Sequence, residues 1–333
     1  MGDILKATIE DVAKRSGLSV VTVSRYINGA STVREYNRKK IQQAMDELNY
    51  TPSSAARTLS SGKTGIVGLL VSHISDNYIN DIIYSINKAL RKKRYYLALS
   101  VVEAGTENDY SYLFEKDRVD GIIIHTSYIT DETLTKLKEE KVPVLSISGD
   151  ELSEEFSTVV SDDYHGGYMV ADYLIELGHK RISHISGPDG MISSRLRQKG
   201  FVDRLKKEGL EPISLLNGAY SVASGYKCAM QCLEKGDMPT AIFVADDQTA
   251  FGVMNAFKNH GISIPGDVSI VGYDDHPYSR ELHPQLTTVS QPAKAIGEHA
   301  VEALFEQMKT ITYKVNTKIK PELVIRESTR PMT

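Results

Sequence analysis

Hydrophobic and polar residues follow two different patterns along this chain, and the pattern changes near residue 64. Before it, apolar residues recur at helical spacing in three short segments, the third over roughly residues 35–48. After it, short apolar runs alternate with longer amphipathic stretches. The first part is therefore predicted to be all-α, and the second to be a parallel β-sheet structure covered by helices.

Polar residues mark the helix ends of the first part. Thr8 followed by Asp11 is a capping box, and Gly17 suits the turn that ends the first helix. Ser19 can cap a second helix that begins at Val20. Two short helices joined by a glycine-containing turn are typical of a helix-turn-helix, whose second helix enters the DNA major groove.

Apolar runs in the second part predict strands, and the amphipathic stretches between them predict helices. The expected strands are 66–71, 96–101, 121–125, 142–147, 158–161, 182–186, 241–245 and 268–273. The expected helices are about 78–93, 107–116, 131–140, 165–177, 194–208, 222–235 and 248–260. This alternation predicts parallel sheets covered by helices.

Several motifs of the first part occur in one order that resembles the lactose-repressor (LacI/GalR) family of bacterial transcription regulators. They are Val12-Ala13, Thr22-Val23-Ser24-Arg25, Asn28 and the block from Tyr50 to Leu59. The resemblance runs from about residue 8 to about residue 329. It implies a helix-turn-helix headpiece followed by an α/β body with the two-lobed fold of periplasmic binding proteins.

The resemblance also implies domain boundaries. We expect a DNA-binding headpiece over residues 1–51, a hinge helix or linker over 52–63, and an effector-binding and dimerisation body over 64–333. The chain would cross between the lobes of the body three times. The first lobe would comprise about 64–161 and 292–320, and the second about 162–291 and 321–333.

The second helix of the headpiece is expected to read DNA. The resemblance places base-reading side chains at Val20 and Val21 and a guanine-reading arginine at Arg25. Alternatively, either valine packs into the headpiece core. Hydroxyl and amide groups that can bond phosphates without reading sequence are those of Thr8, Ser19, Thr22, Ser24, Asn28 and Thr32.

The segment after the headpiece is expected to reach the minor groove. Ala55 and Ala56 are small enough for two such helices to approach closely, and Leu59 matches the family's minor-groove wedge. A segment of about eight residues is not stably helical by itself in water. We therefore expect it to order on DNA, where it would respond to the spacing of the two bodies. A plain linker is the alternative.

Polar residues after the strands of the body are candidate effector ligands. Relative to the family, His73 replaces an aspartate and Asn77-Tyr78 replaces Pro-Phe, which argues against copying the effector of a better-known member. Asp246 replaces an asparagine of the family. Arg197 and Asp274 match the family's effector-binding positions. The full predicted set is His73, Tyr78, Ser148, Tyr164, Arg197, Asp246, Asp274 and Gln291. Each could instead be a satisfied polar group at a strand end.

Carboxylates and a guanidinium suit a polyhydroxylated ligand, because each can pair with two hydroxyls. The sequence therefore predicts a transcriptional regulator of a carbohydrate-utilisation operon, acting as a repressor controlled by a sugar or sugar derivative. The alternative effector is a nucleobase or another metabolite acting as a corepressor. The alternative class is a sugar-binding transport protein. We expect a homodimer, or a dimer of dimers, whose two headpieces bind the half-sites of a near-palindromic operator, because two-fold protein symmetry demands two-fold DNA symmetry.

Composition narrows the class further. Residues 1–63 carry ten Lys and Arg against six Asp and Glu, whereas the remainder carries 29 against 37, which fits a basic head on an acidic body. No motif for catalysis, a cofactor or a metal is present, so we expect no enzyme. Cys228 and Cys232 are expected to be free thiols in a reducing cytoplasm, with a disulfide or a metal site as the alternative. Without a membrane span or signal peptide, a cytoplasmic location is expected.

Overall fold

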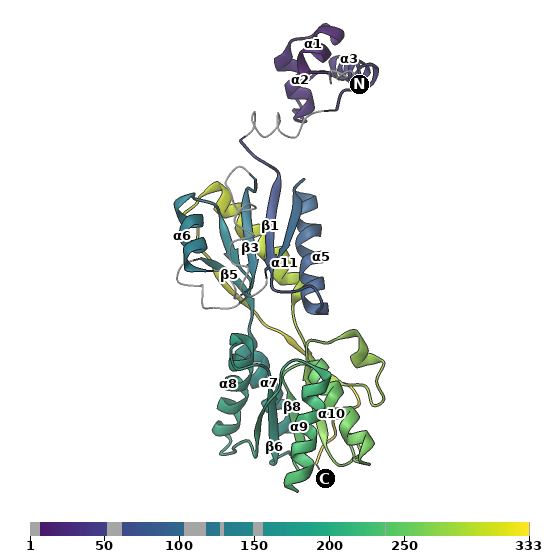
Figure 1. Ribbon diagram of the computed structural model, residues 1–333, viewed down its shortest axis with the longest axis vertical. Coiled ribbons are helices and arrows are strands. Elements are labelled where there is room, and N and C mark those ends of the chain that lie inside the picture. The colour runs from purple at the N-terminus through teal and green to yellow at the C-terminus, as the bar shows by residue number, and fades with distance from the viewer. Residues whose placement is uncertain are drawn as a thin grey trace, which may run out of the picture. The chain divides into compact units, whose positions relative to one another are not determined.

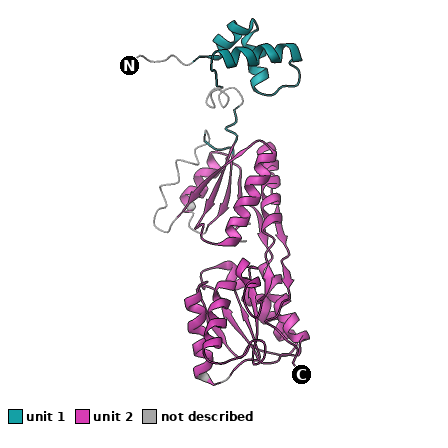
Figure 2. Cartoon of the chain, turned by 90° about the vertical axis from the view of Figure 1, so that its right-hand side faces the viewer, with its two compact units in different colours: residues 1–65, 117–120 teal, residues 66–116, 121–333 magenta. Residues whose placement is uncertain are grey.

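The computed structural model describes residues 7–51, 62–102, 118–126, 130–148, 156–236 and 238–332. The chain divides into two compact units (Figure 2). One comprises residues 1–65 with 117–120, and the other comprises 66–116 with 121–333. The first unit contains the headpiece helices, and the second contains the α/β body.

The headpiece helices begin and end where the sequence predicts. They are α1 (Ile9–Ser16), α2 (Val20–Ile27) and α3 (Glu35–Glu47). Thr8 and Asp11 form the expected capping box, and Gly17 ends α1 with φ 70°. The Ser19 hydroxyl accepts a hydrogen bond from the backbone N–H of Thr22 at the start of α2. Local capping chemistry therefore defines the helix-turn-helix.

One apolar cluster holds the three helices together. Val12 of α1, Val23 of α2 and Ile41 of α3 are fully buried. Ile27 and Leu48 pack against this cluster and are partly buried. A core this small depends on each of its few large side chains, because burying one contributes about 1.5–3 kcal/mol.

The body contains two six-stranded sheets (Figure 1). The first has the order β11-β5-β4-β3-β1-β2, with every pairing parallel. Its strands are β1 (Ile66–Val71), β2 (Tyr96–Val101), β3 (Gly121–His125), β4 (Val144–Ser146), β5 (Ser157–Ser161) and β11 (Asn316–Ile319). The central strands are almost continuously apolar because both faces of a parallel sheet are covered.

The second sheet has the order β12-β10-β9-β8-β6-β7 and is parallel except for the pairing of β12 with β10. Its strands are β6 (Ile182–Ser186), β7 (Leu215–Asn217), β8 (Ala241–Val244), β9 (Ser269–Tyr273), β10 (Thr287–Ser290) and β12 (Glu322–Val324). The headpiece and this two-lobed body confirm the predicted fold class.

Helices accompany both sheets. Those of the first lobe are α5 (Asn77–Lys92), α6 (Asp131–Glu139) and α11 (Ala293–Lys309). Those of the second lobe are α7 (Asp163–Glu176), α8 (Ile192–Lys207), α9 (Val222–Lys235) and α10 (Asp247–Asn259), with the short η3 (Pro277–Arg280) after β9. The pairs α7–α8, α9–α10 and α5–α11 are in extensive contact.

Glycines allow α7 and α8 to approach closely. A Cβ at Gly167 would lie 1.9 Å from the carbonyl oxygen of Arg197, and one at Gly200 would lie 1.9 Å from that of Tyr164. Neither contact is possible for a larger residue without backbone movement. The glycines therefore fix the separation of two helices that both carry residues of the site described below.

Prediction and structure differ mainly at short elements. The predicted strand 142–147 is shorter as β4, and β7, β10, β11 and β12 were not expected. These strands have three or four residues each, too few for a clear periodic signal. The predicted helix 107–116 lies outside the described residues. Within the described part of the chain, no helix has the length and apolar character needed to cross a lipid bilayer.

Candidate functional site

The outer surface of α2 presents the residues predicted to read DNA. Val20 is 41% exposed and Val21 is 61% exposed, whereas Val23 is completely buried. Arg25 is also exposed. The alternative that Val20 or Val21 belongs to the headpiece core is therefore wrong, because neither is part of the buried apolar cluster.

The polar residues around α2 form local hydrogen bonds; Thr8, Ser19 and Asn28 are exposed, and Thr22 and Ser24 are half-buried. The Ser19 and Thr22 hydroxyls are 2.9 Å apart, and Asn28 Nδ2 donates to Ser24 Oγ at 3.5 Å. Thr8 donates through its backbone N–H to Asp11 Oδ2 at 2.9 Å. These side chains, with exposed Thr32, are oriented on the surface before any DNA is bound. The predicted hinge residues Ala55, Ala56 and Leu59 lie outside the described residues.

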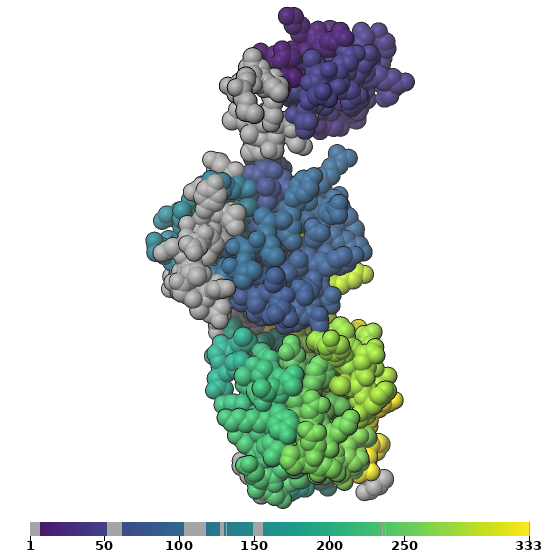
Figure 3. Space-filling view, turned by 45° about the vertical axis from the view of Figure 1, so that its right-hand side comes forward, coloured from purple at the N-terminus to yellow at the C-terminus, as the bar shows by residue number. Residues whose placement is uncertain are grey.

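A cavity of about 660 Å³ in the body takes its lining from both lobes. Figure 3 shows the first lobe, mainly blue, meeting the second, mainly green. All predicted effector residues border this one cavity: His73, Tyr78, Ser148, Tyr164, Arg197, Asp246, Asp274 and Gln291. The strand-end positions chosen from sequence therefore converge in space.

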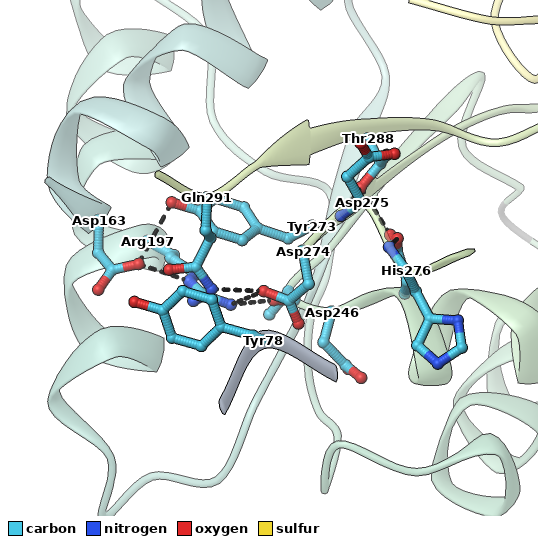
Figure 4. Close-up of polar contacts among 12 residues, drawn as sticks. Tyr78, Asp163, Arg197, Asp246, Tyr273, Asp274, Asp275, His276, Thr288 and Gln291 are labelled. Atoms are coloured by element: carbon cyan, nitrogen blue, oxygen red, sulfur yellow. Dashed lines mark hydrogen bonds and ion pairs between the residues drawn. The ribbon is translucent and has the colours of Figure 1, made fainter. Parts of the chain in front are cut away.

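Arg197 of α8 is the buried cation of the cavity. Its Nε donates to Asp163 Oδ1 at 2.8 Å, and its Nη1 donates to the carbonyl oxygen of Ala245 at 2.6 Å. The guanidinium lies 3.7 Å from the centre of the Tyr273 ring (Figure 4). Burial acts to lower the pKa of Arg197, but Asp163, Tyr220 and Asp274 outweigh burial and raise it well above its usual value. Arg197 therefore remains charged.

Asp274 follows β9 in a strained backbone conformation. Its φ is 105°, and that of Asp275 is 50°, both in the region that favours glycine. Asp274 Oδ1 accepts a hydrogen bond from Gln291 Nε2 at 2.7 Å and lies 3.5 Å from Arg197 Nη1. Asp275 pairs with Arg326 and Arg280, which helps to hold this loop. Strain of this kind is typical of functional sites.

Burial raises the pKa of the Asp274 carboxyl well above its usual range. Arg197 opposes this rise, whereas Asp246 and Asp247 reinforce it by electrostatic repulsion. A ligand that brings N–H or O–H donors to Asp274 stabilises the ionised form. Binding of a donor-rich ligand would therefore favour the Asp274 carboxylate, which can accept its hydrogen bonds.

Asp246 and Asp247 have structural partners that sequence alone did not reveal. Asp246 caps α10, where it accepts from the backbone N–H groups of Gln248 and Thr249. Asp247 accepts from Ser279 Oγ, Thr288 Oγ1 and the backbone N–H of His276, at 2.6, 2.7 and 2.8 Å. A helix cap thus accounts for Asp246 without a ligand, as the alternative interpretation allowed, although the residue borders the cavity.

Aromatic rings border the cavity from both lobes. Tyr78, on α5, contacts His125 edge-on, with ring centres 6.3 Å apart, and lies beside Arg197 and Asp274 in Figure 4. Tyr220 comes from the second lobe, and its ring packs directly over Gly187, where a Cβ would be only 2.2 Å away. The cavity therefore offers aromatic surface next to its polar groups, which suits the face of a ring-shaped ligand.

The remaining predicted residues border the cavity but also have other contacts. His73 is exposed, and Ser148 Oγ lies 3.2 Å from Ser146 Oγ. The Tyr164 hydroxyl donates to Asp203 Oδ2 on α8 at 3.1 Å, so this group is used within the second lobe. These side chains border the cavity, but each is either exposed to solvent or in contact with another residue of the protein.

Sequence reasoning did not assign several residues of the site. Asp163 is the ion-pair partner of Arg197, and Asn77 contacts His276 across the two lobes at 2.7 Å. His276 Nδ1 also accepts a hydrogen bond from the backbone N–H of Tyr278 at 3.2 Å. The position of Asp163 just after a predicted strand was a signal for a site residue, but no sequence pattern indicated that Arg197 is its partner.

Acidic side chains outnumber basic ones around the cavity. Six aspartates border it, at positions 76, 162, 163, 246, 247 and 274, and the basic residues are Arg197 and Lys318. Asp163 already pairs with Arg197, so this guanidinium is not available to neutralise an added anion. The lining therefore suits neutral ligands better than phosphates and acids.

Comparisons with known proteins agree over nearly the whole chain. Residues 8–53 match the model of bacterial regulatory proteins of the lacI family, and residues 171–329 match that of the periplasmic binding protein-like domain. A protein from Mannheimia succiniciproducens named HTH-type transcriptional repressor PurR is 32% identical, covering 97% of this chain and 99% of the relative.

Solved structures of similar proteins also match nearly the whole chain. The lac repressor dimer bound to operator and the anti-inducer ONPF superposes with a TM-score of 0.86 at 30% identity, covering 97% of this chain and 99% of that one. A complex of the transcriptional regulator CelR with cellobiose superposes with a TM-score of 0.73 at 28% identity, with the same coverage.

Proposed function

The chain belongs to the LacI family of bacterial regulatory proteins and is a DNA-binding transcriptional repressor, and we propose that a small, uncharged, ring-shaped effector in the body cavity controls its operator affinity. The observation that carries the proposal is the edge formed by Asp274, Gln291 and Arg197 beside the Tyr78 ring. It presents acceptor and donor groups next to an aromatic surface.

We infer that the effector is a nucleobase-type compound. The curated relatives carry the name PurR, which we take to denote repression linked to purines. A planar base fits the chemistry of the cavity, since Tyr78 and Tyr220 offer faces for stacking. Its N–H donors would pair with the Asp274 carboxylate, and its acceptors with the Gln291 amide. This choice replaces a sugar as the leading candidate.

A neutral sugar is the second candidate. It is favoured by the cellobiose complex of the similar regulator CelR and by the polar edge itself, which can pair with adjacent hydroxyls. Both candidates share the absence of negative charge, as expected from the acidic lining.

The headpiece would bind DNA through α2, with Val20, Val21 and Arg25 toward the bases. Two headpieces of a homodimer would occupy the half-sites of a near-palindromic operator. The segment 52–63, including Leu59, is proposed as the connection that responds to the body. By linkage, an effector that changes operator affinity is itself bound more or less tightly when operator is present.

A thermal-shift screen of the full chain tests the effector proposal. The probes are purine and pyrimidine bases, neutral mono- and disaccharides, and nucleotides and sugar phosphates as anionic counterparts. A ligand at 100 times its dissociation constant should stabilise the body by about 2.7 kcal/mol. The response should disappear in Asp274→Asn and persist in the matched variant Asp172→Asn, which changes an aspartate outside the cavity lining.

The outcome separates the alternatives. A response to bases alone supports the nucleobase proposal, and a response to neutral sugars alone supports the second candidate. A response to anionic probes only would contradict the account of the acidic cavity. No response to any probe would reject both ligand classes, while binding of selected operator DNA would still identify the repressor.

A further inference from the structure

Four side chains form one continuous chain of polar contacts, which we call the Arg197 network: Asp163, Arg197, Asp274 and Gln291 (Figure 4). Arg197 Nε donates to Asp163 Oδ1 at 2.8 Å. Arg197 Nη1 lies 3.5 Å from Asp274 Oδ1, and Gln291 Nε2 donates to the same oxygen at 2.7 Å. The network thus runs from α7 through α8 and the end of β9 to the segment after β10.

The two ends of the network lie where the chain passes between the lobes. Asp163 begins α7 immediately after β5, a strand of the first sheet, although α7 itself packs in the second lobe. Gln291 follows β10 of the second sheet and precedes α11, which packs in the first lobe. Rotation of one lobe relative to the other must change the backbone at such connections.

The half of the network around Asp163 and Arg197 is held rigidly. Asp163 Oδ1 also accepts from the Tyr273 hydroxyl at 3.2 Å, and Tyr273 lies under the guanidinium. The backbone of Arg197 is packed against Gly167 too closely for any Cβ at that position. A buried ion pair with these additional contacts has little freedom to rearrange.

The half around Asp274 is held less tightly. The separation of 3.5 Å between Arg197 Nη1 and Asp274 Oδ1 is longer than a good N–H···O hydrogen bond of about 2.7–3.2 Å. Arg197 Nη1 already donates to the carbonyl oxygen of Ala245. The short contact of Asp274 is therefore the one with Gln291, a half-buried side chain that borders the cavity.

We propose that Asp163 is a positioning residue, and that the Arg197 network connects occupation of Asp274 to both crossing segments. Asp163 orients Arg197, Arg197 helps to place Asp274, and Asp274 restrains Gln291. A ligand donor at Asp274 competes with Gln291 for the same oxygen and so loosens the segment between β10 and α11. This final step rests on the proposed function, whereas the mechanical connection does not.

Hydrogen–deuterium exchange of the ligand-free, full-length protein tests the connection. Asp163→Asn keeps the size of the side chain but removes its charge. Amides of residues 289–296 should exchange at least fivefold faster than in the wild type, because the restraint on Gln291 is weakened at its far end. Asp163→Glu keeps the negative charge and should therefore raise the exchange rate of the same amides by a smaller factor.

A second ion pair between the same two helices provides the matched control. Arg204 Nε of α8 donates to Asp172 Oδ1 of α7 at 2.6 Å. Asp172→Asn should therefore leave exchange in residues 289–296 unchanged. The reciprocal variant Gln291→Ala alters a half-buried residue and should accelerate exchange in residues 162–166, even if Asp163→Asn does not fold.

Two outcomes would overturn the proposal. One is an effect of Asp163→Asn confined to α7 and α8, as for Asp172→Asn. The other is an equal increase in every segment of the protein, which would mean general destabilisation. Because neither ligand nor operator is present in this experiment, its failure is distinct from failure of the effector proposal.

Discussion

Replacing Val21 by glutamine tests how the headpiece faces DNA. Val21 is the second residue of α2 and is 61% exposed, so the change should alter stability by no more than about 0.5 kcal/mol. A glutamine amide can bond both N6 and N7 of adenine, whereas valine offers only apolar contact. Such a pair discriminates between bases by about 1–3 kcal/mol, or roughly 5- to 150-fold.

The assay is selection of bound sequences from a randomised DNA pool by the full-length protein. We expect the preferred base to change at one position in each half-site, symmetrically, because a dimer presents α2 twice. Val222→Gln is the matched control. It makes the same change at an exposed valine in the first turn of a body helix, α9, and should leave the preferred sequence unchanged.

A folding control separates loss of specificity from loss of the headpiece. Val23→Gln places an amide in the apolar cluster, so it should unfold the headpiece and abolish binding to every sequence. If Val21→Gln is folded and binds DNA with the wild-type base preference, Val21 does not face the bases. The assignment of the α2 surface would then be wrong.

Three other variants test the physical account. Burial lowers the pKa of His184 to about 4, so the unfolded chain binds a proton that the folded chain excludes. Stability should fall by up to about 3 kcal/mol as the pH drops from about 6.5 to 4, and His184→Leu should reduce this slope in urea titrations. Gly167→Ala, which forces a Cβ against the Arg197 carbonyl, should lower the free energy of unfolding by more than about 2 kcal/mol, whereas Gly190→Ala, with open space around it, should be close to neutral. Thr8→Ala should cost the headpiece about 1 kcal/mol without DNA, measured by thermal melting, and Thr8→Ser should restore it.

Sequence alone determined most of the fold, because the decisive signals are local. The Thr8 cap and Gly17 define the ends of α1 within one turn of chain. Buried parallel strands such as β1 and β3 are apolar throughout, so their runs were identified directly. Short strands such as β11 were missed, because their place depends on pairing with β5, more than 150 residues earlier in the chain.

Sequence also located the cavity residues, since the ends of parallel strands meet at one edge of a sheet. It could not decide what each side chain does there. The Asp246 carboxylate caps its own helix, and Arg197 is held by Asp163, a partner 34 residues away that no spacing rule identifies. Side-chain direction and burial depend on contacts between distant segments. The tertiary structure alone therefore decided which polar groups are already paired and which remain for a ligand.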